Sequence, residues 1–176
     1  MKSVIYYAMI IFTGMVFLSA LWPVKREYQM AWMLQLGQKI VKLSCSYFSY
    51  KLEFENFKAI EESGPCIFLL EPHGVLPVSI FWGSLDVLPH HQVLCCLSDA
   101  IFAIPLMKHV LTWCGAVSAD KITMLKSLKD GYSLNICPGG VQEVQFLGSS
   151  NNECVMFLKS RTGLIKLAKQ EGVSVV

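Results

Sequence analysis

One segment of the chain sets its architecture: Cys66-Ile67-Phe68-Leu69-Leu70, followed at once by Glu71-Pro72-His73-Gly74. A short apolar run that ends in proline and glycine is typical of a buried strand that stops at a tight turn. In α/β folds, the loops at the carboxyl ends of strands are where chemistry is done. Histidine is the side chain best suited to accept a proton near neutral pH, so His73 is the first candidate for a catalytic role.

A second segment repeats this pattern. The run Ser133-Leu134-Asn135-Ile136-Cys137 precedes Pro138-Gly139-Gly140-Val141-Gln142-Glu143. If both runs are strands of one sheet, we expect His73 and Glu143 to face one another across its mouth. Gly139 and Gly140 allow backbone conformations closed to other residues, so their N–H groups could point at an oxyanion or at phosphates; a plain tight turn is the alternative.

The rest of the chain alternates between strand and helix patterns, which predicts a mixed or parallel sheet with helices on both faces. Further strands are expected at 93–97 and 173–176, and a half-exposed strand at 47–57. Helices are expected at 76–88, from Ser98 or Asp99 to Trp113, at 122–129 with Gly131 as C-cap, and at 162–170.

The composition points to a membrane. Hydrophobic residues make up 53% of the chain and charged residues only 16%, against about 25% in typical soluble domains. The net charge of +2, without a basic tail or a patch of basic and aromatic residues, argues against a nucleic-acid partner.

The uncharged run Val4 to Trp22 is long enough to cross a membrane as one helix, because its residues at about 1.5 Å each nearly match a hydrocarbon core of about 30 Å. A cleaved signal peptide and a re-entrant hairpin bent at Gly14 are the alternatives. Lys25 and Arg26 follow the run, and Lys2 precedes it, which favours a cytosolic position for the remaining chain.

Residues 27–42 have apolar side chains at helical spacing. We expect an amphipathic helix that lies on the membrane surface or packs on the domain core. The predicted division is a membrane anchor at 1–25, a juxtamembrane helix at 26–46 and a catalytic domain at 47–176.

The cysteines and remaining histidines suggest no metal site. Seven cysteines without a Cys-x-x-Cys pair or a zinc spacing predict buried free thiols in a reducing compartment. Cys95 and Cys96 are adjacent in a predicted strand and should point to opposite faces. His90 and His91 are interpreted as solvated loop residues and His109 as structural, so no metal ligand set can be built.

Four blocks of the chain can be compared with known families: Glu71-Pro72-His73-Gly74, Ile101 to Val117, Pro138-Gly139-Gly140 with Glu143, and Arg161-Thr162-Gly163 with the helix that follows. In this order they resemble the diacylglycerol acyltransferase 2 family, a membrane-bound branch of the lysophospholipid acyltransferase superfamily. The first block looks like a variant of the family's His-Pro-His-Gly tetrapeptide. The resemblance covers roughly residues 47–176 and is specific because all four blocks occur in order.

The resemblance implies transfer of a fatty acyl group from acyl-CoA to a neutral lipid alcohol. Diacylglycerol is the implied acceptor and triacylglycerol the product, with monoacylglycerol or a long-chain alcohol as alternatives. His73 would be the general base. The superfamily's aspartate five residues later is replaced by Val78, so Glu71 and Glu143 are the candidates to orient the ring. The residues implied in substrate binding are Pro72, Gly74, Gly139, Gly140 and Arg161.

The resemblance also implies an enzyme of the endoplasmic reticulum membrane that uses acyl-CoA as co-substrate and needs no metal or organic cofactor. Membrane lipid is the implied environment, and a homo-oligomer is compatible with it. Members of the family continue well past Val176, which predicts an incomplete domain with little transferase activity alone. The rival hypothesis is a catalytically inactive membrane protein that binds lipid or a partner acyltransferase.

Overall fold

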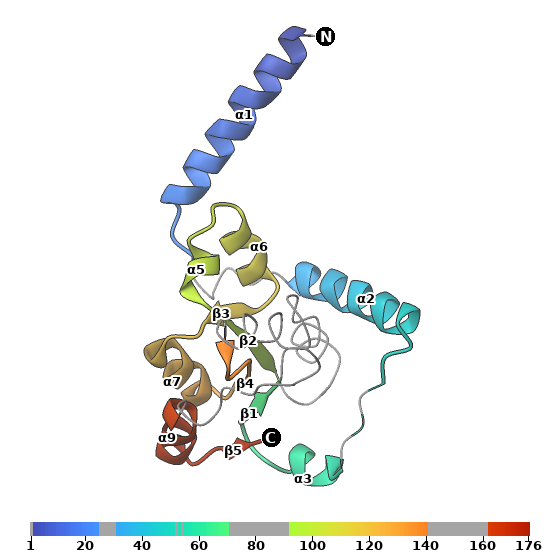
Figure 1. Cartoon of the computed structure of the whole chain (residues 1–176), viewed down its shortest axis with the longest axis vertical. Helices are drawn as coiled ribbons and strands as arrows, with labels where there is room; N and C mark the ends of the chain where they lie inside the picture. The colour runs from blue at the N-terminus through green and yellow to red at the C-terminus, as the bar shows by residue number, and fades with distance from the viewer. Residues whose placement is uncertain (1, 25–30, 52, 54, 71–91, 141–161) are drawn as a thin grey trace, which may run out of the picture.

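The computed structural model describes residues 2–24, 31–51, 53, 55–70, 92–140 and 162–176 (Figure 1). Its centre is a five-stranded sheet in the order β3-β2-β4-β1-β5, and every neighbouring pair is parallel. In chain order the strands are β1 (Cys66–Leu69), β2 (Val93–Leu97), β3 (Ala116–Ser118), β4 (Ser133–Ile136) and β5 (Ser174–Val175).

The described helices are α1 (Lys2–Leu21), α2 (Ala31–Tyr47), α3 (Phe57–Glu61), α5 (Asp99–Phe102), α6 (Met107–Trp113), α7 (Lys121–Lys129) and α9 (Thr162–Glu171). Side chains of α7 and α9 pack on one face of the sheet, and side chains of α5 and α6 pack on the other. The predicted α/β fold with helices on both faces is therefore confirmed. Strands covered on both faces read as continuous apolar runs, which is why β1 and β2 stand out in the sequence. Strand β4 is also buried along its length, although Ser133 and Asn135 alternate with its apolar residues.

The two neighbouring cysteines of β2 show the layering. Cys96 belongs to the core under α7 and α9, whereas Cys95 packs with the side chains of α5 and α6. Their opposite orientations confirm the prediction from the period of two in a strand.

The ends of α7 follow from local chemistry. Asp120 accepts hydrogen bonds from the N–H groups of Ile122 and Thr123 at 2.9 and 3.0 Å, which caps the first turn. At the other end Gly131 has φ +86°, and the N–H of Tyr132 reaches the Ser127 carbonyl at 3.0 Å. This is the helix end that glycine favours, and it confirms the predicted C-cap.

Helix α1 extends away from the sheet, and its carboxyl end lies beside α5 and α6 (Figure 1). The span Val4–Leu21 has a mean hydropathy of 2.1 and is the one described helix that is long and apolar enough to cross a membrane. Helix α2 follows with an exposed apolar stripe along one face, formed by Trp32, Leu36, Ile40 and Leu43.

The predicted strand at 47–57 is wrong. Helix α2 runs through Tyr47, and α3 begins at Phe57. The helix ends because Ser49 adopts φ +51° and the N–H of Tyr50 bonds to the Cys45 carbonyl at 2.9 Å. An alternating pattern becomes a strand only where a neighbouring strand pairs with it, and the sheet places none there in the described part.

The single helix predicted from Ser98 to Trp113 is also wrong in its continuity. Ser98 does cap a helix, since its hydroxyl accepts the Ala100 N–H at 3.4 Å. The helix stops at Phe102, and α6 starts only after Pro105, which lacks an N–H group and disfavours a helical residue before it. Leu106 then turns the chain with φ +63°.

Two elements were not predicted, and one predicted helix lies outside the described residues. Strand β3 has three residues and is defined by its pairing with β2. Helix α3 has five residues and is capped by Asn56, which accepts the Ala59 N–H at 3.1 Å. The helix predicted at 76–88 falls in the part of the chain that is not described.

Candidate active site

The carboxyl ends of β1 and β4 lie side by side. Leu69 pairs with Ile136, and the N–H of Leu70 donates to the Ile136 carbonyl at 3.1 Å. Glu71 is the next residue after Leu70, and Pro138 follows Ile136 by two positions. The first and third sequence blocks therefore leave the sheet from adjacent strands at the same edge.

Most of the candidate residues lie beyond the described part of the chain. This holds for Glu71, Pro72, His73, Gly74, Glu143 and Arg161. The facing arrangement of His73 and Glu143 thus remains a prediction. The structure does describe the start of each segment and, for Arg161, the helix α9 that directly follows it.

The Gly139–Gly140 turn is described. Gly139 is buried and Gly140 half-buried, immediately beyond the carboxyl end of β4. Gly140 has φ +61°, a region that residues with a Cβ adopt only with strain. Glycine is therefore needed at position 140 for the backbone conformation alone, with or without a ligand at this turn.

On the other side of β4, the carboxyl ends of β2 and β3 lie at the same edge of the sheet and are joined by a hydrogen bond. The Ser118 hydroxyl, at the end of β3, donates to the carboxylate of Asp99, just after β2. The same hydroxyl accepts the N–H of Asp120 at 3.0 Å. No role was predicted for Ser118 or Asp120; the available signal was an aspartate just before the helix predicted at 122–129, where it can serve as the N-cap.

Hydrogen bonding holds the pKa of the Asp120 carboxyl below its ordinary value. The largest cause is the side-chain hydrogen bond with Thr123, followed by the N–H of the same residue. Ser118 and the N–H of Ile122 act in the same direction, and partial burial opposes them. Asp120 is therefore a charged helix cap at this edge.

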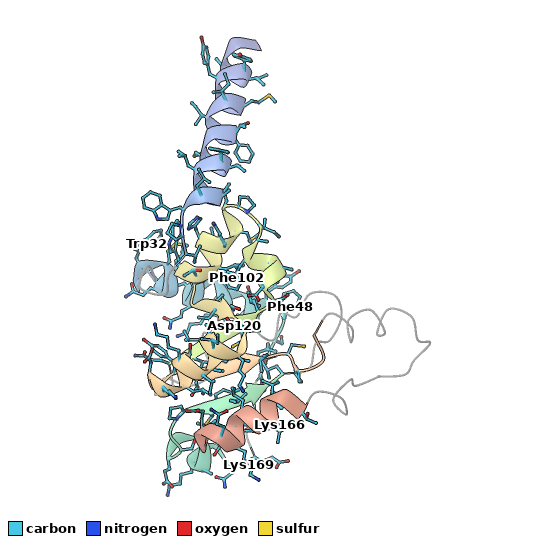
Figure 2. All side chains as sticks on the ribbon, turned by 90° about the vertical axis from the view of Figure 1, so that its left-hand side faces the viewer. Trp32, Phe48, Phe102, Asp120, Lys166 and Lys169 are labelled. Carbon is cyan, nitrogen blue, oxygen red and sulfur yellow. The ribbon has the colours of Figure 1, made fainter. Side chains whose placement is uncertain are left out.

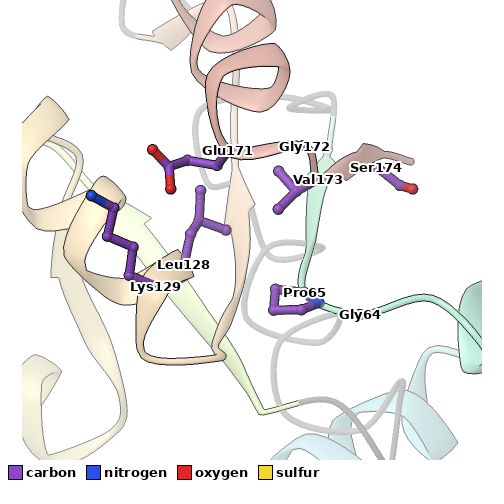
Figure 3. Close-up of a pocket in the computed structure, with 8 residues that line it drawn as sticks. All are labelled: Gly64, Pro65, Leu128, Lys129, Glu171, Gly172, Val173 and Ser174. Atoms are coloured by element: carbon purple, nitrogen blue, oxygen red, sulfur yellow. The ribbon is translucent and has the colours of Figure 1, made fainter.

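The pocket drawn in Figure 3 lies at the opposite edge of the sheet. It has a volume of about 290 Å³ and is lined by the segments that lead into β1 and β5 and by the ends of α7 and α9. Its lining residues are Gly64, Pro65, Leu128, Lys129, Glu171, Gly172, Val173 and Ser174. Since β1 and β5 begin at this pocket, it is not the place to which their carboxyl ends lead.

The described cysteines are thiols that form no disulfide, and Cys66, Cys95 and Cys96 are buried. Burial raises the pKa of the Cys96 thiol, and it also raises the pKa of Cys114. Such thiols stay protonated and act as packing groups. Within the described residues, no group of three or more His, Cys, Asp or Glu side chains could hold a metal ion.

Fold and strand ends define a class of protein: a parallel α/β domain joined to an apolar helix of membrane-crossing length. The chain belongs to the diacylglycerol acyltransferase family, which matches residues 3–176. It is 31% identical over 119 residues to diacylglycerol O-acyltransferase 2 of Dictyostelium discoideum. The alignment covers 62% of this chain and 36% of that protein, so the chain spans about a third of the relative's length. No solved structure gives a significant match.

Proposed function

We propose that the protein transfers a fatty acyl group from acyl-CoA to a neutral lipid alcohol, with diacylglycerol as the acceptor. One observation carries the proposal: β1 and β4 are adjacent and parallel, so the segments with His73 and Gly139–Gly140 start at one edge of the sheet. Membership of the family supports the acyl transfer, and the similarity to a protein named diacylglycerol O-acyltransferase 2 supports the acceptor.

In the proposed reaction, His73 takes the proton of the acceptor hydroxyl while its oxygen attacks the thioester carbon. A C–O bond forms and the carbonyl oxygen becomes an oxyanion, for which the N–H groups of the Gly139–Gly140 turn are the candidate donors. The oxyanion then collapses and the C–S bond breaks. The proton passes from His73 to sulfur, so CoA leaves as a thiol and the ester remains. The proposal involves no metal or organic cofactor.

The other candidate residues have supporting roles. Glu71 or Glu143 would accept the second ring N–H of His73 and hold the imidazole in its reactive tautomer. Arg161 directly precedes α9, and a cation at the amino end of a helix is suited to the phosphates of CoA. Pro72 and Gly74 would shape the turn that holds the histidine.

We place the protein in the endoplasmic reticulum membrane with its α/β domain on the cytosolic side. Helix α1 is apolar enough to span, and Lys25 and Arg26 follow it. The exposed apolar stripe of α2 supports the surface-lying alternative for that helix over packing on the core.

The test compares His73→Ala with His91→Ala, a histidine to which no role is assigned. The variants are made in an active form of the chain that is extended past Val176 and are expressed in a host that lacks its own triacylglycerol synthesis. Incorporation of labelled oleoyl-CoA into neutral lipid is then measured. We expect His73→Ala to lower turnover by about a hundredfold or more, with the protein still in the membrane fraction, and His91→Ala to match the wild type.

Near-normal synthesis by His73→Ala would count against the proposal. Glu71→Gln and Glu143→Gln show which carboxylate orients His73. The variant with the larger loss of turnover is the one that has lost this carboxylate.

A further inference from the structure

The carboxyl end of α1 is hydrogen-bonded to the start of α6. The Ser19 hydroxyl accepts the N–H of Leu106 at 3.1 Å, and the Ser19 carbonyl accepts His109 Nε2 at 3.0 Å. Lys108 Nζ donates to the carbonyls of Ala20 and Trp22 at 3.1 and 2.9 Å. We call these contacts the clasp.

The clasp meets a need of the apolar helix. The last carbonyls of any helix have no partner within it, so they take donors from side chains or from water. Lys108 and His109 supply the missing donors. A cation at the carboxyl end of a helix also interacts favourably with the helix dipole.

The clasp fixes how far α6 can lie from the end of the span. Helix α6 has seven residues, so it is about 10 Å long at about 1.5 Å per residue. The headgroup layer of a bilayer is about 5–8 Å deep on each side of the hydrocarbon core. Because hydrogen bonds hold Leu106 and Lys108 to Ser19 and Ala20, the first turn of α6 lies within this layer if α1 spans the membrane.

The segment that leads into α6 and the first half of this helix expose three apolar side chains. Ile104, Met107 and Val110 are 50%, 46% and 42% exposed and follow one another at intervals of three residues. Figures 1 and 2 both show α5 and α6 directly at the carboxyl end of α1, and Figure 1 shows the β3 edge of the sheet nearer to it than β5.

We propose that Ile104, Met107 and Val110 form a membrane-docking face that rests among the lipids beside α1 and is held there by the clasp. The occupant is the phospholipid bilayer, because the face continues from the end of the apolar span. Docking makes the β3 edge the membrane-proximal side of the domain. This inference rests on the proposed membrane span of α1 and is independent of the acyl transfer.

The test places a benzophenone amino acid at single positions of the full chain in phosphatidylcholine vesicles that carry a clickable lipid. Positions 104, 107 and 110 report the docking face, position 12 reports the span, and position 122 is the control. Ile122 is 80% exposed on α7, so it matches the test residues in chemistry but not in location. The probe is apolar and large, which suits exposed apolar sites.

After irradiation, we expect lipid adducts at positions 104, 107 and 110 roughly tenfold or more above position 122. Adducts at position 12 without adducts at 104, 107 and 110 would overturn docking while keeping the span. No adducts at position 12 would overturn the span itself. Cross-linked dimers at position 107 would assign the face to a second copy of the chain and overturn the lipid assignment.

The clasp is tested with Lys108→Met, which keeps the apolar stem and removes the charge. We expect lipid adducts at position 107 to fall while those at position 12 stay constant. Lys126→Met, at an exposed position of α7, serves as the matched control. Unchanged adducts at position 107 in Lys108→Met would show that the ammonium group does not hold the face in place.

Discussion

Single residues determine where the described elements stop. Leu106 and Ser49 are the non-glycine residues with positive φ in the described chain, and each lies at a helix boundary. Asp120 caps α7 and joins the hydrogen bonds of Ser118 at the carboxyl edge of the sheet. These residues act through hydrogen bonds and backbone angles close to them in the sequence, so the effect of a substitution can be assigned to one side chain. Figure 2 shows Asp120 among the side chains of the domain.

Asp120 should make the stability of the domain depend on pH. Its pKa is lowered in the folded state, so its stabilisation is fully present above the ordinary aspartate pKa and is lost as the pH falls through the lowered value. We therefore expect the Tm in detergent to fall less from about pH 7 to about pH 3 in Asp120→Asn than in the wild type. Asparagine caps a helix nearly as well but does not titrate.

Asp120→Ala is the companion variant. It removes the cap at every pH and should cost about 1 kcal/mol of unfolding free energy. Parallel Tm curves for the wild type and Asp120→Asn would show that the hydrogen-bonded carboxylate contributes nothing to the acid sensitivity.

At the scale of elements, α1 differs from every other described helix. Its side chains from Val4 to Leu18 are exposed apart from the half-buried Val16, and its carboxyl end alone is held by the domain. An apolar surface of this extent is expected to be covered by lipid. The helix needs no sequence-specific partner along its length, because its backbone groups are satisfied internally.

A charge in the middle of α1 should impair membrane insertion. Lysine at the centre of a span costs about 2.5–3.5 kcal/mol on insertion scales. We expect the wild type to resist alkaline carbonate extraction and Ile11→Lys to be partly released. Ile122→Lys, at an exposed position of α7, should behave like the wild type.

Two outcomes would contradict this expectation. Release of the intact wild-type chain by carbonate would show that α1 is not a membrane anchor. A shortened mature chain beginning near Leu21 would identify the segment as a signal peptide.

At the scale of the whole molecule, the described sheet holds the domain together. Leu134 of β4 is fully buried, and β4 lies between β1 and β2. Its side chain packs in the cluster that contains Ile67 and Leu94 from these neighbouring strands. The same strand leads to the Gly139–Gly140 turn, so the strand that packs in the core also positions this part of the candidate site.

Leu134→Ala should therefore destabilise the whole domain. Truncation of a buried leucine costs about 2–5 kcal/mol, whereas an exposed substitution changes stability by less than about 0.5 kcal/mol. Urea unfolding in detergent, followed by circular dichroism, would compare Leu134→Ala with Ile122→Ala. Equal midpoints for the two variants would contradict the central position of β4.

The amino-acid sequence was sufficient for the features that depend on neighbours along the chain. Strands β1 and β2 are short apolar runs, β4 precedes the turn residues Pro138 and Gly139, and α7 and α9 have helical spacing and glycine ends. The candidate catalytic residue, His73 with Glu71 or Glu143, was proposed because its turn follows an apolar run, and it stays a prediction because these residues lie beyond the described part of the chain. The family was evident from the four blocks, and residues 3–176 match it.

Tertiary structure alone decided the features that depend on distant residues. The order β3-β2-β4-β1-β5 places β1 beside β4, and β3 exists because β2 pairs with it. The break at Pro105 turns the chain so that Leu106 and Lys108 reach the end of α1. The reason is that strand pairing joins backbone groups whose hydrogen bonds carry no side-chain signal, so a local pattern cannot encode the partner strand. The clasp joins side chains to backbone groups that are distant in the sequence, so a local pattern cannot encode that partner either.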